Sequence, residues 1–446
     1  MHLRALRLQN FRCFREASFE FPRITLLTGR NSSGKTTVIN GLLTVVQGTH
    51  VEPYPFTLTQ NGDLCTLGGY RDLVYGKNVR SPLGLDIKVG SGAYQTEAEQ
   101  QWTVEATYDY FRETRSGAPR RIKIQSLNGS FEAEIDETRK YSVAFERVGG
   151  ETEETRRREI LAAMSKVSGF SPRFGNDKER PEFSRVLRKR GIARLRNMND
   201  VTAAFPNEVL YTTYLSEFFN VFLDMQRTFR YLGPARLYPR RFYFERTMTE
   251  TRVGPQGENL PQLLARWRRN EPEKLRKVVE YLQELSLAVG LFPLHVKSNV
   301  LQIMINVGRR SFSLEDVGFG LSQVLPMLVS DIELGEAATL AMSQPELHLH
   351  PAAQAAIAEY MWKRTKELKR QYVVETHSEY LLNRFRLLVS KGVIPEEDIA
   401  LYYLSLEEDR VEPKRIHIRK NGTLEGAPKD FFDTYRLDSF NLAMSV

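Results

Sequence analysis

Apolar and polar positions along residues 1–47 follow a pattern that predicts strand, turn, strand, loop and helix. Residues 1–11 place leucines between charged or polar residues, which is typical of a strand with one buried face. Ile24–Leu27 is a short, mostly apolar run and predicts a buried strand. From Val38 to Val46 the apolar residues recur at the spacing of an amphipathic helix.

The middle of the chain changes from a strand-rich part to a helical part. Residues 101–148 alternate in short runs, and the Asn-Gly pair at 128–129 lies between two of them, which strongly indicates a hairpin. Between residues 150 and 230 the strand pattern fades and charged, helix-compatible sequence follows, so we predict a helical insertion. Residues 258–287 continue as helices that are interrupted at Pro272.

Strand and helix patterns alternate again from Leu301 onward, and this alternation predicts parallel βαβ units. The predicted elements are a strand at 337–342, a helix after Pro351, a strand at 372–375, a helix at 379–390 and a strand at 401–404. We therefore expect an α/β fold whose sheet is assembled from both ends of the chain.

Composition excludes several classes of protein. The chain has 446 residues, of which 26% are charged and 41% hydrophobic. Its start is not a signal peptide, and no apolar run reaches the roughly 18 residues of a membrane-spanning helix, so we expect no membrane association. Cys13 and Cys65 are the only cysteines, which excludes a disulfide framework and predicts a cytoplasmic location. The net charge of +8 permits binding to nucleic acid or to an acidic protein.

Residues 29–36, with the sequence GRNSSGKT, match the phosphate-loop pattern G-x-x-x-x-G-K-[ST]. In such a loop the glycines let backbone N–H groups point at phosphate oxygens, the lysine reaches the β- and γ-phosphates, and the threonine hydroxyl ligates Mg²⁺. A strand precedes the loop and a helix follows it, and the positive end of that helix adds to the site. We predict a nucleotide–Mg²⁺ site with Lys35 and Thr36 at its centre.

Further motifs indicate the class of nucleotide-binding protein. They are NFRCF at 10–14, YLGPAR at 231–236, EDVGFGLSQVLP at 315–326, SQPELHLHP at 343–351 and ETHS at 375–378. With these motifs in this order, the chain resembles the OLD- and SMC-like branch of the ABC-type ATPases over residues 1–90 and 230–446. The resemblance implies a bilobed ATPase head with a mainly parallel central sheet, a strand-rich lobe and a helical insertion. Its halves are expected at 1–149 and 231–446, and the insertion at 150–230.

The resemblance also implies a homodimer that shares its nucleotides, with higher assembly left open. Each ATP lies between Lys35 of one copy and Ser322 of the other, so dimerisation is coupled to ATP binding. His377 is expected to be the switch histidine that contacts the γ-phosphate. The implied nucleotide-binding residues are Arg12, Asn31, Ser33, Gly34, Lys35, Thr36, Thr37, Gly320 and Ser322.

Two positions that are usually acidic in this family are not acidic here. The family places a carboxylate that holds Mg²⁺ through water where this chain has Ser343, and many ABC proteins place a second where this chain has Gln344. A serine ligates a metal weakly, and a glutamine orients water without accepting its proton. Glu346 is the nearest carboxylate in the sequence and either substitutes for these acids or braces the loop. We therefore predict ATP binding with slow or conditional hydrolysis.

Two other features have both a functional and an ordinary explanation. Glu346, His348 and His350 could bind a metal, but no further ligand of suitable spacing is present, and the segment already has a family role. Two basic clusters could bind nucleic-acid phosphates or an acidic partner, or could simply form solvated helix faces. The first contains Arg185, Arg188, Lys189, Arg190, Arg194 and Arg196, and the second contains Arg227, Arg230, Arg236, Arg240 and Arg241.

The resemblance leads us to expect an ATP-gated switch, sensor or scaffold for a separate effector protein in bacterial anti-phage defence. OLD relatives carry a C-terminal Toprim nuclease, whereas residues 378–446 are too few for that domain, so any nuclease is expected to be a separate protein. A DNA-repair clamp acting directly on DNA is the alternative. A transporter subunit is disfavoured by the FGLSQ motif. Salt-sensitive binding to duplex DNA would favour repair, and a stable complex with a co-encoded protein would favour the switch.

Overall fold

The computed structural model describes residues 2–48, 54–91, 100–112, 115–135, 141–147, 206–244, 252–297, 299–407, 410–428, 431, 441 and 444. These residues form two compact units, one from residues 3–19 and 40–227 and the other from residues 20–39 and 228–446. Both contain helices and sheets, so the predicted mixed α/β fold is confirmed. Most of the predicted insertion at 150–230 and all of the first basic cluster lie outside the described residues.

The first unit contains a seven-stranded sheet in the order β2-β1-β4-β5-β6-β7-β8. Its strands are β1 (His2–Phe11), β2 (Phe14–Glu20), β4 (Leu83–Ser91), β5 (Gln100–Phe111), β6 (Ser116–Ser126), β7 (Gly129–Ile135) and β8 (Tyr141–Arg147). Strands β4 to β8 pair antiparallel, and Ser126 pairs with Gly129, so the hairpin predicted at 128–129 is confirmed. Short helices α2 (Tyr70–Leu73) and η1 (Tyr75–Lys77) precede β4.

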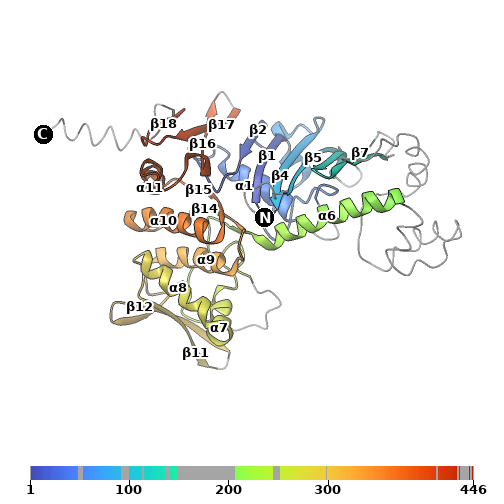
Figure 1. The fold of residues 1–446 in the computed structure, drawn as a ribbon. Helices are drawn as coiled ribbons and strands as arrows, with labels where there is room; N and C mark the ends of the chain where they lie inside the picture. The colour runs from blue at the N-terminus through green and yellow to red at the C-terminus, as the bar shows by residue number, and fades with distance from the viewer. Residues whose placement is uncertain are drawn as a thin grey trace. The chain divides into compact units, whose positions relative to one another are not determined.

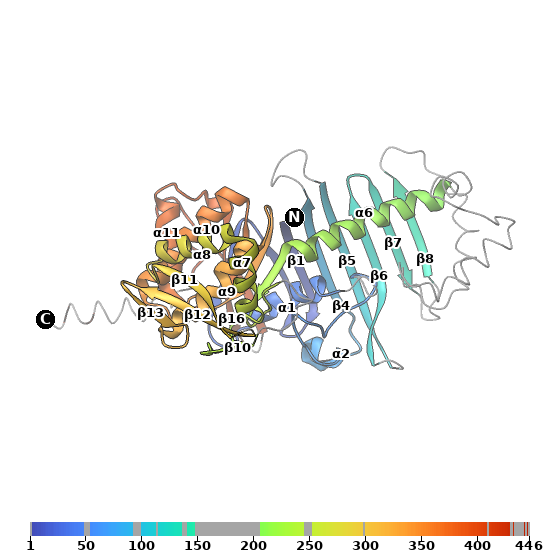
Figure 2. The ribbon, with the colours of Figure 1, turned by 90° about the horizontal axis from the view of Figure 1, so that it is seen from below.

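Helix α6 (Pro206–Thr228) crosses the strands of this sheet, as Figure 2 shows. Tyr214, Phe218 and Phe222 are four residues apart and therefore lie on one face of the helix. The rings of Tyr214 and Phe218 pack against Trp102 of β5, with centroids 5.1 and 5.7 Å away. The Tyr214 hydroxyl also donates to the carbonyl of Gly129 at 2.8 Å. Aromatic packing thus fixes α6 on the sheet.

The second unit is built around a seven-stranded sheet in the order β18-β17-β16-β3-β15-β14-β9. Its strands are β3 (Ile24–Gly29), β9 (Phe229–Leu232), β14 (Thr339–Ser343), β15 (Gln371–Glu375), β16 (Ile399–Glu407), β17 (Arg410–Ile418) and β18 (Leu424–Glu425). Strands β16, β3, β15, β14 and β9 run parallel to one another, and β17 pairs antiparallel with β16. All of β3 is buried because it lies between β15 and β16, so the sheet does combine both ends of the chain.

Helices α1 (Lys35–Val46), α9 (Phe319–Glu333), α10 (Pro351–Leu368) and α11 (Glu379–Ser390) follow strands or loops of this sheet, and a short η2 (Glu396–Asp398) precedes β16. Figure 1 shows α9, α10 and α11 in successive layers. His350 caps α10 with Pro351 in its first turn, and the Ser378 hydroxyl accepts from the Leu381 N–H at the start of α11. Capping residues therefore start both helices at the motifs recognised in the sequence.

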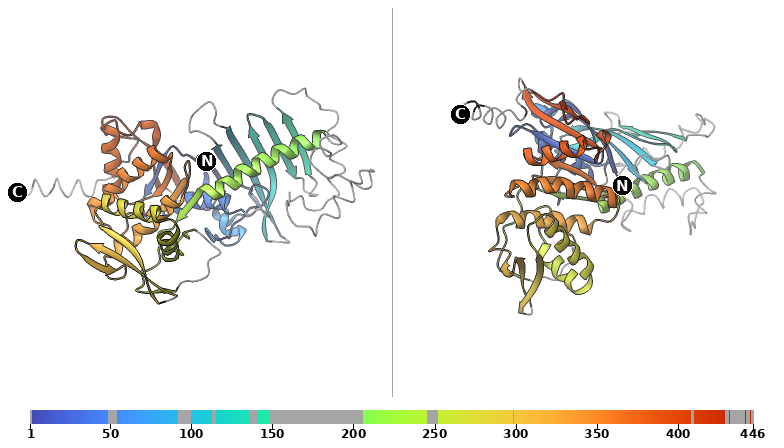
Figure 3. Two further views of the ribbon diagram at one scale, coloured as in Figure 1. Left: turned by 60° about the horizontal axis from the view of Figure 1, so that its bottom comes forward. Right: turned by 60° about the vertical axis from the view of Figure 1, so that its left-hand side comes forward.

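Helices α7 (Leu260–Asn270) and α8 (Pro272–Glu284) lie against a small antiparallel sheet in both views of Figure 3. The predicted interruption at Pro272 is confirmed, since α8 begins with this proline. The sheet consists of β10 (Tyr243–Phe244), β11 (Gly290–Lys297), β12 (Val300–Val307) and β13 (Arg310–Ser313). No helix within the described ranges has the length and apolar character needed to cross a membrane.

Candidate nucleotide-binding site

The phosphate loop connects the carboxyl end of β3 to the start of α1. Gly29 has φ +140°, and a Cβ there would lie 2.2 Å from the carbonyl oxygen of Leu404. Gly34 has φ +88°, a conformation that residues with side chains rarely adopt. Both glycines of the pattern are therefore required by the backbone itself. The first turn of α1 also leaves N–H groups without helical partners, which suits an anion.

Lys35 folds back over this loop. Its Nζ donates to the carbonyl oxygens of Gly29 at 3.1 Å and Arg30 at 2.6 Å, and the residue is only 4% exposed. Burial lowers the pKa of Lys35, while the negative charge of Glu375 opposes this shift. The Ser33 hydroxyl is also buried and has no hydrogen-bond partner among the described residues. Weakly compensated donors at the loop fit a phosphate group, which supplies acceptor oxygens.

A carboxylate from the neighbouring strand lies beside Thr36. The Thr36 hydroxyl donates to both oxygens of Glu375, at 2.9 and 3.1 Å, and the buried Ser343 hydroxyl donates to Glu375 Oε2 at 2.9 Å. Glu346 is therefore not the acid nearest to Ser343 in space. Sequence reasoning missed Glu375, although it ends a buried parallel strand, where ligand-binding residues gather in such sheets.

Glu346 is buried at the loop after β14 and acts as an acceptor for the next strand. Its Oε1 accepts from the Thr376 hydroxyl and from the His377 N–H, both at 2.8 Å. Burial raises the pKa of Glu346, which these bonds and the charge of Arg236 oppose. Its other oxygen has no hydrogen-bond partner in the described part of the chain. The carboxylate thus braces the segment that carries His377.

Arg236 lies buried beside the same loop. Its guanidinium donates to the carbonyl of Ser343 at 3.1 Å, and burial lowers its pKa to about 10 against the opposing charge of Glu346. The buried arginine therefore holds the end of β14, a role that the sequence analysis did not assign to it. Gln344 has φ +49°, and its N–H donates to the Glu375 carbonyl at 2.7 Å, so the backbone after β14 is fixed from both sides.

His377 follows β15, which ends at Glu375. Its backbone is held by Glu346, and its side chain remains accessible to solvent. Burial of part of the ring and the nearby positive charge of Lys35 lower the pKa of His377, so the imidazole is neutral at pH 7. A neutral imidazole near Lys35 can donate one hydrogen bond to a phosphate oxygen.

The signature motif begins α9. A Cβ at Gly320 would lie 2.4 Å from the carbonyl oxygen of His348, so this glycine allows the helix to approach the acidic loop. The ring of Phe319 meets the ring of His348 edge-on at 4.8 Å. The Ser322 hydroxyl donates to the Phe319 carbonyl at 2.6 Å. The signature is therefore packed directly on the loop that follows β14.

The other predicted site residues take ordinary positions. Asn31 is exposed in the loop, and the Thr37 N–H donates to the Gly34 carbonyl at 3.0 Å. Arg12 belongs to the first compact unit, and its role in nucleotide binding stays a prediction. His350 caps α10 through Nδ1, which accepts from Ala352 N–H at 3.3 Å, so this imidazole already has a structural role.

Three arginines of the second basic cluster contact groups within the chain. Arg230 lies 3.8 Å from Glu333, and Arg236 is buried at β14. Arg241 forms ion pairs with Glu315 at 3.1 Å and with Asp316 at 2.6 Å. These three arginines have partners within the chain, whereas Arg240 is exposed, so binding of nucleic-acid phosphates by this cluster stays a prediction.

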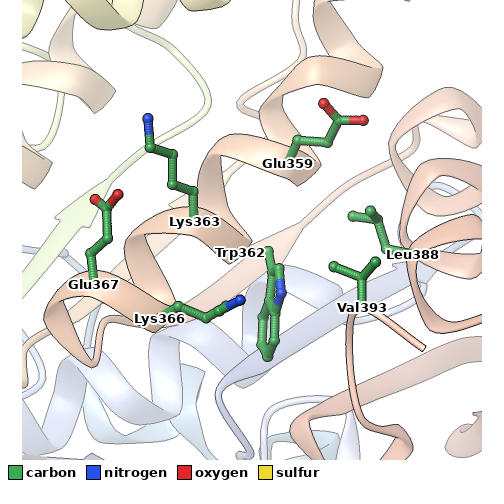
Figure 4. Close-up of a pocket in the computed structure, with 7 residues that line it drawn as sticks. All are labelled: Glu359, Trp362, Lys363, Lys366, Glu367, Leu388 and Val393. Atoms are coloured by element: carbon green, nitrogen blue, oxygen red, sulfur yellow. The ribbon is translucent and has the colours of Figure 1, made fainter. Parts of the chain in front are cut away.

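A depression of about 400 Å³ lies between α10 and the end of α11 (Figure 4). It is lined by Glu359, Trp362, Lys363, Lys366, Glu367, Leu388 and Val393. None of these side chains belongs to the predicted nucleotide site. We assign the depression no role.

Two families of known proteins match the two sequence segments that form the candidate site. Residues 5–59, which include the phosphate loop, match the family described as AAA domain. Residues 212–383, which include the signature, the acidic loop and His377, match the family described as AAA domain, putative AbiEii toxin, Type IV TA system. No curated protein matches the chain.

Several solved structures are similar to the chain along most of its length, at 12% identity. The SMC head domain from Thermotoga maritima has a TM-score of 0.39, with 93% of this chain and 98% of that chain covered. An SMC head bound to the C-terminal winged-helix domain of ScpA has a TM-score of 0.41, with coverages of 94% and 99%. An SMC head with an extended coiled coil, bound to a ScpA domain from Pyrococcus furiosus, has a TM-score of 0.39, with coverages of 93% and 96%.

TM-scores of this size do not establish a common fold, so the fold rests on the chain's own sheets. The phosphate loop, the signature and the strand-end residues all lie in sequence that matches AAA domain families. Two segments of the chain therefore match AAA-type ATPase domain families, and the first of them contains the phosphate loop.

Proposed function

We propose that this chain binds ATP with Mg²⁺ at residues 29–36, forms a homodimer around shared nucleotides, and acts as a switch for a separate effector protein. The phosphate loop carries this proposal. Lys35 is buried with only loop carbonyls as acceptors, and the Thr36 hydroxyl lies beside a carboxylate at a helix start. In this proposal the second unit holds the ABC-type core with its mainly parallel sheet, and the first unit is the strand-rich lobe.

The dimer is proposed from the signature motif. Ser322 lies in the first turns of α9, where the positive end of the helix favours a phosphate. In the single chain its hydroxyl donates to the Phe319 carbonyl and the residue is 5% exposed, so contact with a phosphate of a second copy requires the start of α9 to shift as well as the hydroxyl to turn. ATP would then stabilise the dimer, because it would bind more tightly where Lys35 of one copy and Ser322 of the other both contact it.

Hydrolysis is proposed to be slow or conditional. Gln344 can orient an attacking water but cannot take its proton. Glu346 already accepts two hydrogen bonds, one from the Thr376 hydroxyl and one from the backbone N–H of His377. A general base works best when it can reach the attacking water and hold its proton, and both carboxylates near β14 are engaged elsewhere.

A role in bacterial defence is supported by the description of the family matched by residues 212–383, which names a putative AbiEii toxin of a toxin–antitoxin system. An ATP-held switch fits such a system, since a toxic effector must be restrained until a trigger appears. The effector in this proposal is a separate protein held by the ATP-bound form.

The proposed function is tested by ATP binding and dimerisation of the purified protein. Wild-type protein should bind ATP in a calorimeter and become a dimer in light scattering when ATP and Mg²⁺ are added, with little phosphate release. Lys35→Ala should weaken ATP binding at least about 30-fold, because it removes a buried cation that contacts phosphate and such charge-assisted contacts contribute about 2 kcal/mol or more.

Lys391→Ala, which removes an exposed lysine after α11, is the matched control and should bind ATP as wild type does. Equal ATP affinity in wild type and Lys35→Ala would contradict the assignment of the phosphate loop. Tight binding by a protein that stays monomeric would contradict the switch but leave the ATP site intact.

A further inference from the structure

We infer that Glu375 supplies the carboxylate for the Mg²⁺ that accompanies ATP, so that the metal-binding acid of this site lies on β15 and not at position 343 of β14. This inference rests on the proposed function, since it concerns the same nucleotide site. The motifs recognised in the sequence give Glu375 no role in metal binding.

The contacts of Glu375 place its carboxylate at the threonine of the phosphate loop. Both of its oxygens accept from the Thr36 hydroxyl, at 2.9 and 3.1 Å, and Oε2 also accepts from Ser343 at 2.9 Å. In a phosphate loop this threonine hydroxyl is itself a ligand of Mg²⁺. A carboxylate in hydrogen-bond contact with that hydroxyl is therefore close enough to share the same metal or one of its waters.

The strand register explains how an acid on β15 can serve in place of an acid on β14. Ser343 and Glu375 are directly paired on the parallel strands β14 and β15, so their side chains leave the sheet on the same side. Neighbouring strands lie about 4.8 Å apart. Glu375 therefore lies one strand away from position 343. The glutamate side chain is one methylene longer than that of aspartate and can span this distance, and the small Ser343 leaves room for its carboxylate.

The electrostatics of Glu375 favour a cation at this place. The residue is 5% exposed, and in the described part of the chain its carboxylate accepts from two neutral hydroxyls and forms no salt bridge. The negative charge of Glu375 acts on Lys35, whose pKa it raises. Once Lys35 is turned to phosphate, a buried carboxylate beside Thr36 is poorly compensated, and a divalent cation restores the balance.

Glu346 is a weaker candidate for the same role. Its Oε1 is occupied by Thr376 and by the His377 N–H, and its charge faces the buried Arg236. No group of three His, Cys, Asp or Glu side chains in the described ranges is placed to hold a metal by itself. A single carboxylate is enough here, since Mg²⁺ takes its other ligands from phosphates, waters and the Thr36 hydroxyl.

The inference is tested with AMP-PNP, a non-hydrolysed ATP analogue, and with Mn²⁺ as the metal probe. AMP-PNP affinity is measured by calorimetry in Mg²⁺ and in EDTA, and Mn²⁺ held in the protein–nucleotide complex is measured by electron paramagnetic resonance. Glu375→Gln should leave the affinity in EDTA unchanged, lose the gain that Mg²⁺ gives, and weaken Mn²⁺ binding about 10- to 100-fold. Glu379→Gln, an acid in the first turn of α11, should behave as wild type.

The double variant Ser343→Asp/Glu375→Gln returns the acid to β14 and should recover the metal-dependent gain in affinity. It also keeps the inference testable if the single variant does not fold, which thermal unfolding without ligand will show. Metal dependence retained in Glu375→Gln, affinity lost equally in Mg²⁺ and EDTA, or no recovery in the folded double variant would each overturn the inference. If wild type binds AMP-PNP without any gain from Mg²⁺, the inference fails together with the Mg²⁺ part of the proposed function, whereas the proposed ATP site stands. If wild type binds no AMP-PNP, the proposed function fails with it.

Discussion

Gly320 is a residue whose smallness, more than its backbone freedom, shapes the site. A Cβ at this position would lie 2.4 Å from the His348 carbonyl oxygen and 3.0 Å from the side chain of Leu349. The loop cannot easily retreat, because His348 has φ +62° and its ring packs on Phe319. Gly320→Ala should therefore destabilise the protein by about 1–3 kcal/mol, as overpacking generally does. Urea unfolding of the purified variant measures this loss.

Gly318 gives a matched control two residues earlier. It has φ −50°, and a Cβ there would meet nothing within 4 Å. Gly318→Ala should therefore change the free energy of unfolding by no more than about 0.5 kcal/mol. Equal losses from both substitutions would show that general features of the helix start, and not the contact with His348, make a glycine necessary at position 320.

Residue types and spacing singled out the phosphate loop and His377 but not the contacts of Glu375. Lys35, Thr36 and His377 were recognised because their motifs are local in sequence, and the structure places Lys35 and Thr36 on the phosphate loop and His377 at a strand end. Glu375 and Arg236 were missed because their roles depend on strand neighbours. The pairing of Ser343 with Glu375 joins positions from two separate strands, and nothing in either strand alone reports it.

A buried ionic network holds together the elements that position the site. Asp331 of α9 accepts from Arg364 of α10 at 2.8 Å and from Arg370, which precedes β15, at 2.7 Å. The hydroxyls of Tyr360 and Tyr372 donate to the same carboxylate at 2.7 and 3.1 Å. Burial pushes the pKa of Asp331 upward, but the charges of the two arginines outweigh this and hold the pKa below its usual range.

Asp331→Asn should destabilise the protein by about 3–5 kcal/mol, because it leaves two buried arginines without a counter-charge. Urea unfolding near pH 7 measures the loss. Glu367→Gln is the control, since Glu367 pairs with the same Arg364 but is 45% exposed, and it should cost less than about 1 kcal/mol. A small effect of Asp331→Asn would mean that the tyrosines and backbone carbonyls satisfy the arginines without Asp331.

The difference in free energy of unfolding between wild type and Asp331→Asn should depend on pH. Because the folded-state pKa of Asp331 is depressed, its contribution to stability is fully present above the unfolded-state value of about 3.9 and is lost as the pH falls through the lower folded-state value. The stability difference between wild type and Asp331→Asn should therefore be constant above about pH 5 and shrink below about pH 4.

Elements with strong local signals were predictable, and those that depend on pairing were not. Helix α11 spans the predicted residues 379–390 because a capping serine starts it and a long apolar face follows. Strand β11 was not predicted, since Pro293 lies within it and proline normally disfavours a strand. It forms because β12 pairs with it, with Pro293 opposite Ile303, and because α7 and α8 cover the small sheet.

At the scale of the whole molecule, the order of motifs predicted a sheet assembled from both ends of the chain. Strand β3 carries the phosphate loop between β15 and β16, which come from residues more than 300 positions later. The domain boundaries at 150 and 230 stay predictions, because most of that segment lies outside the described residues. Whether Ser322 of a second copy completes the ATP site depends on the assembly of two chains, so an experiment on two copies is required to test it.

Mixing two defective variants tests whether the nucleotide is shared between copies. Lys35→Ala removes the phosphate-binding cation, and Ser322→Asp puts a negative charge where a γ-phosphate is expected, in an early turn of α9 where an acid suits the helix. Each variant alone should stay monomeric with ATP and Mg²⁺, because both of its shared sites are broken. In a mixed dimer, Lys35 of the Ser322→Asp copy faces Ser322 of the Lys35→Ala copy, so one intact site remains. Sedimentation velocity should therefore show ATP-dependent dimers in the mixture alone. If each copy instead used its own Lys35 and its own Ser322, the mixture would contain no intact site and would remain monomeric, which would contradict the shared-nucleotide switch.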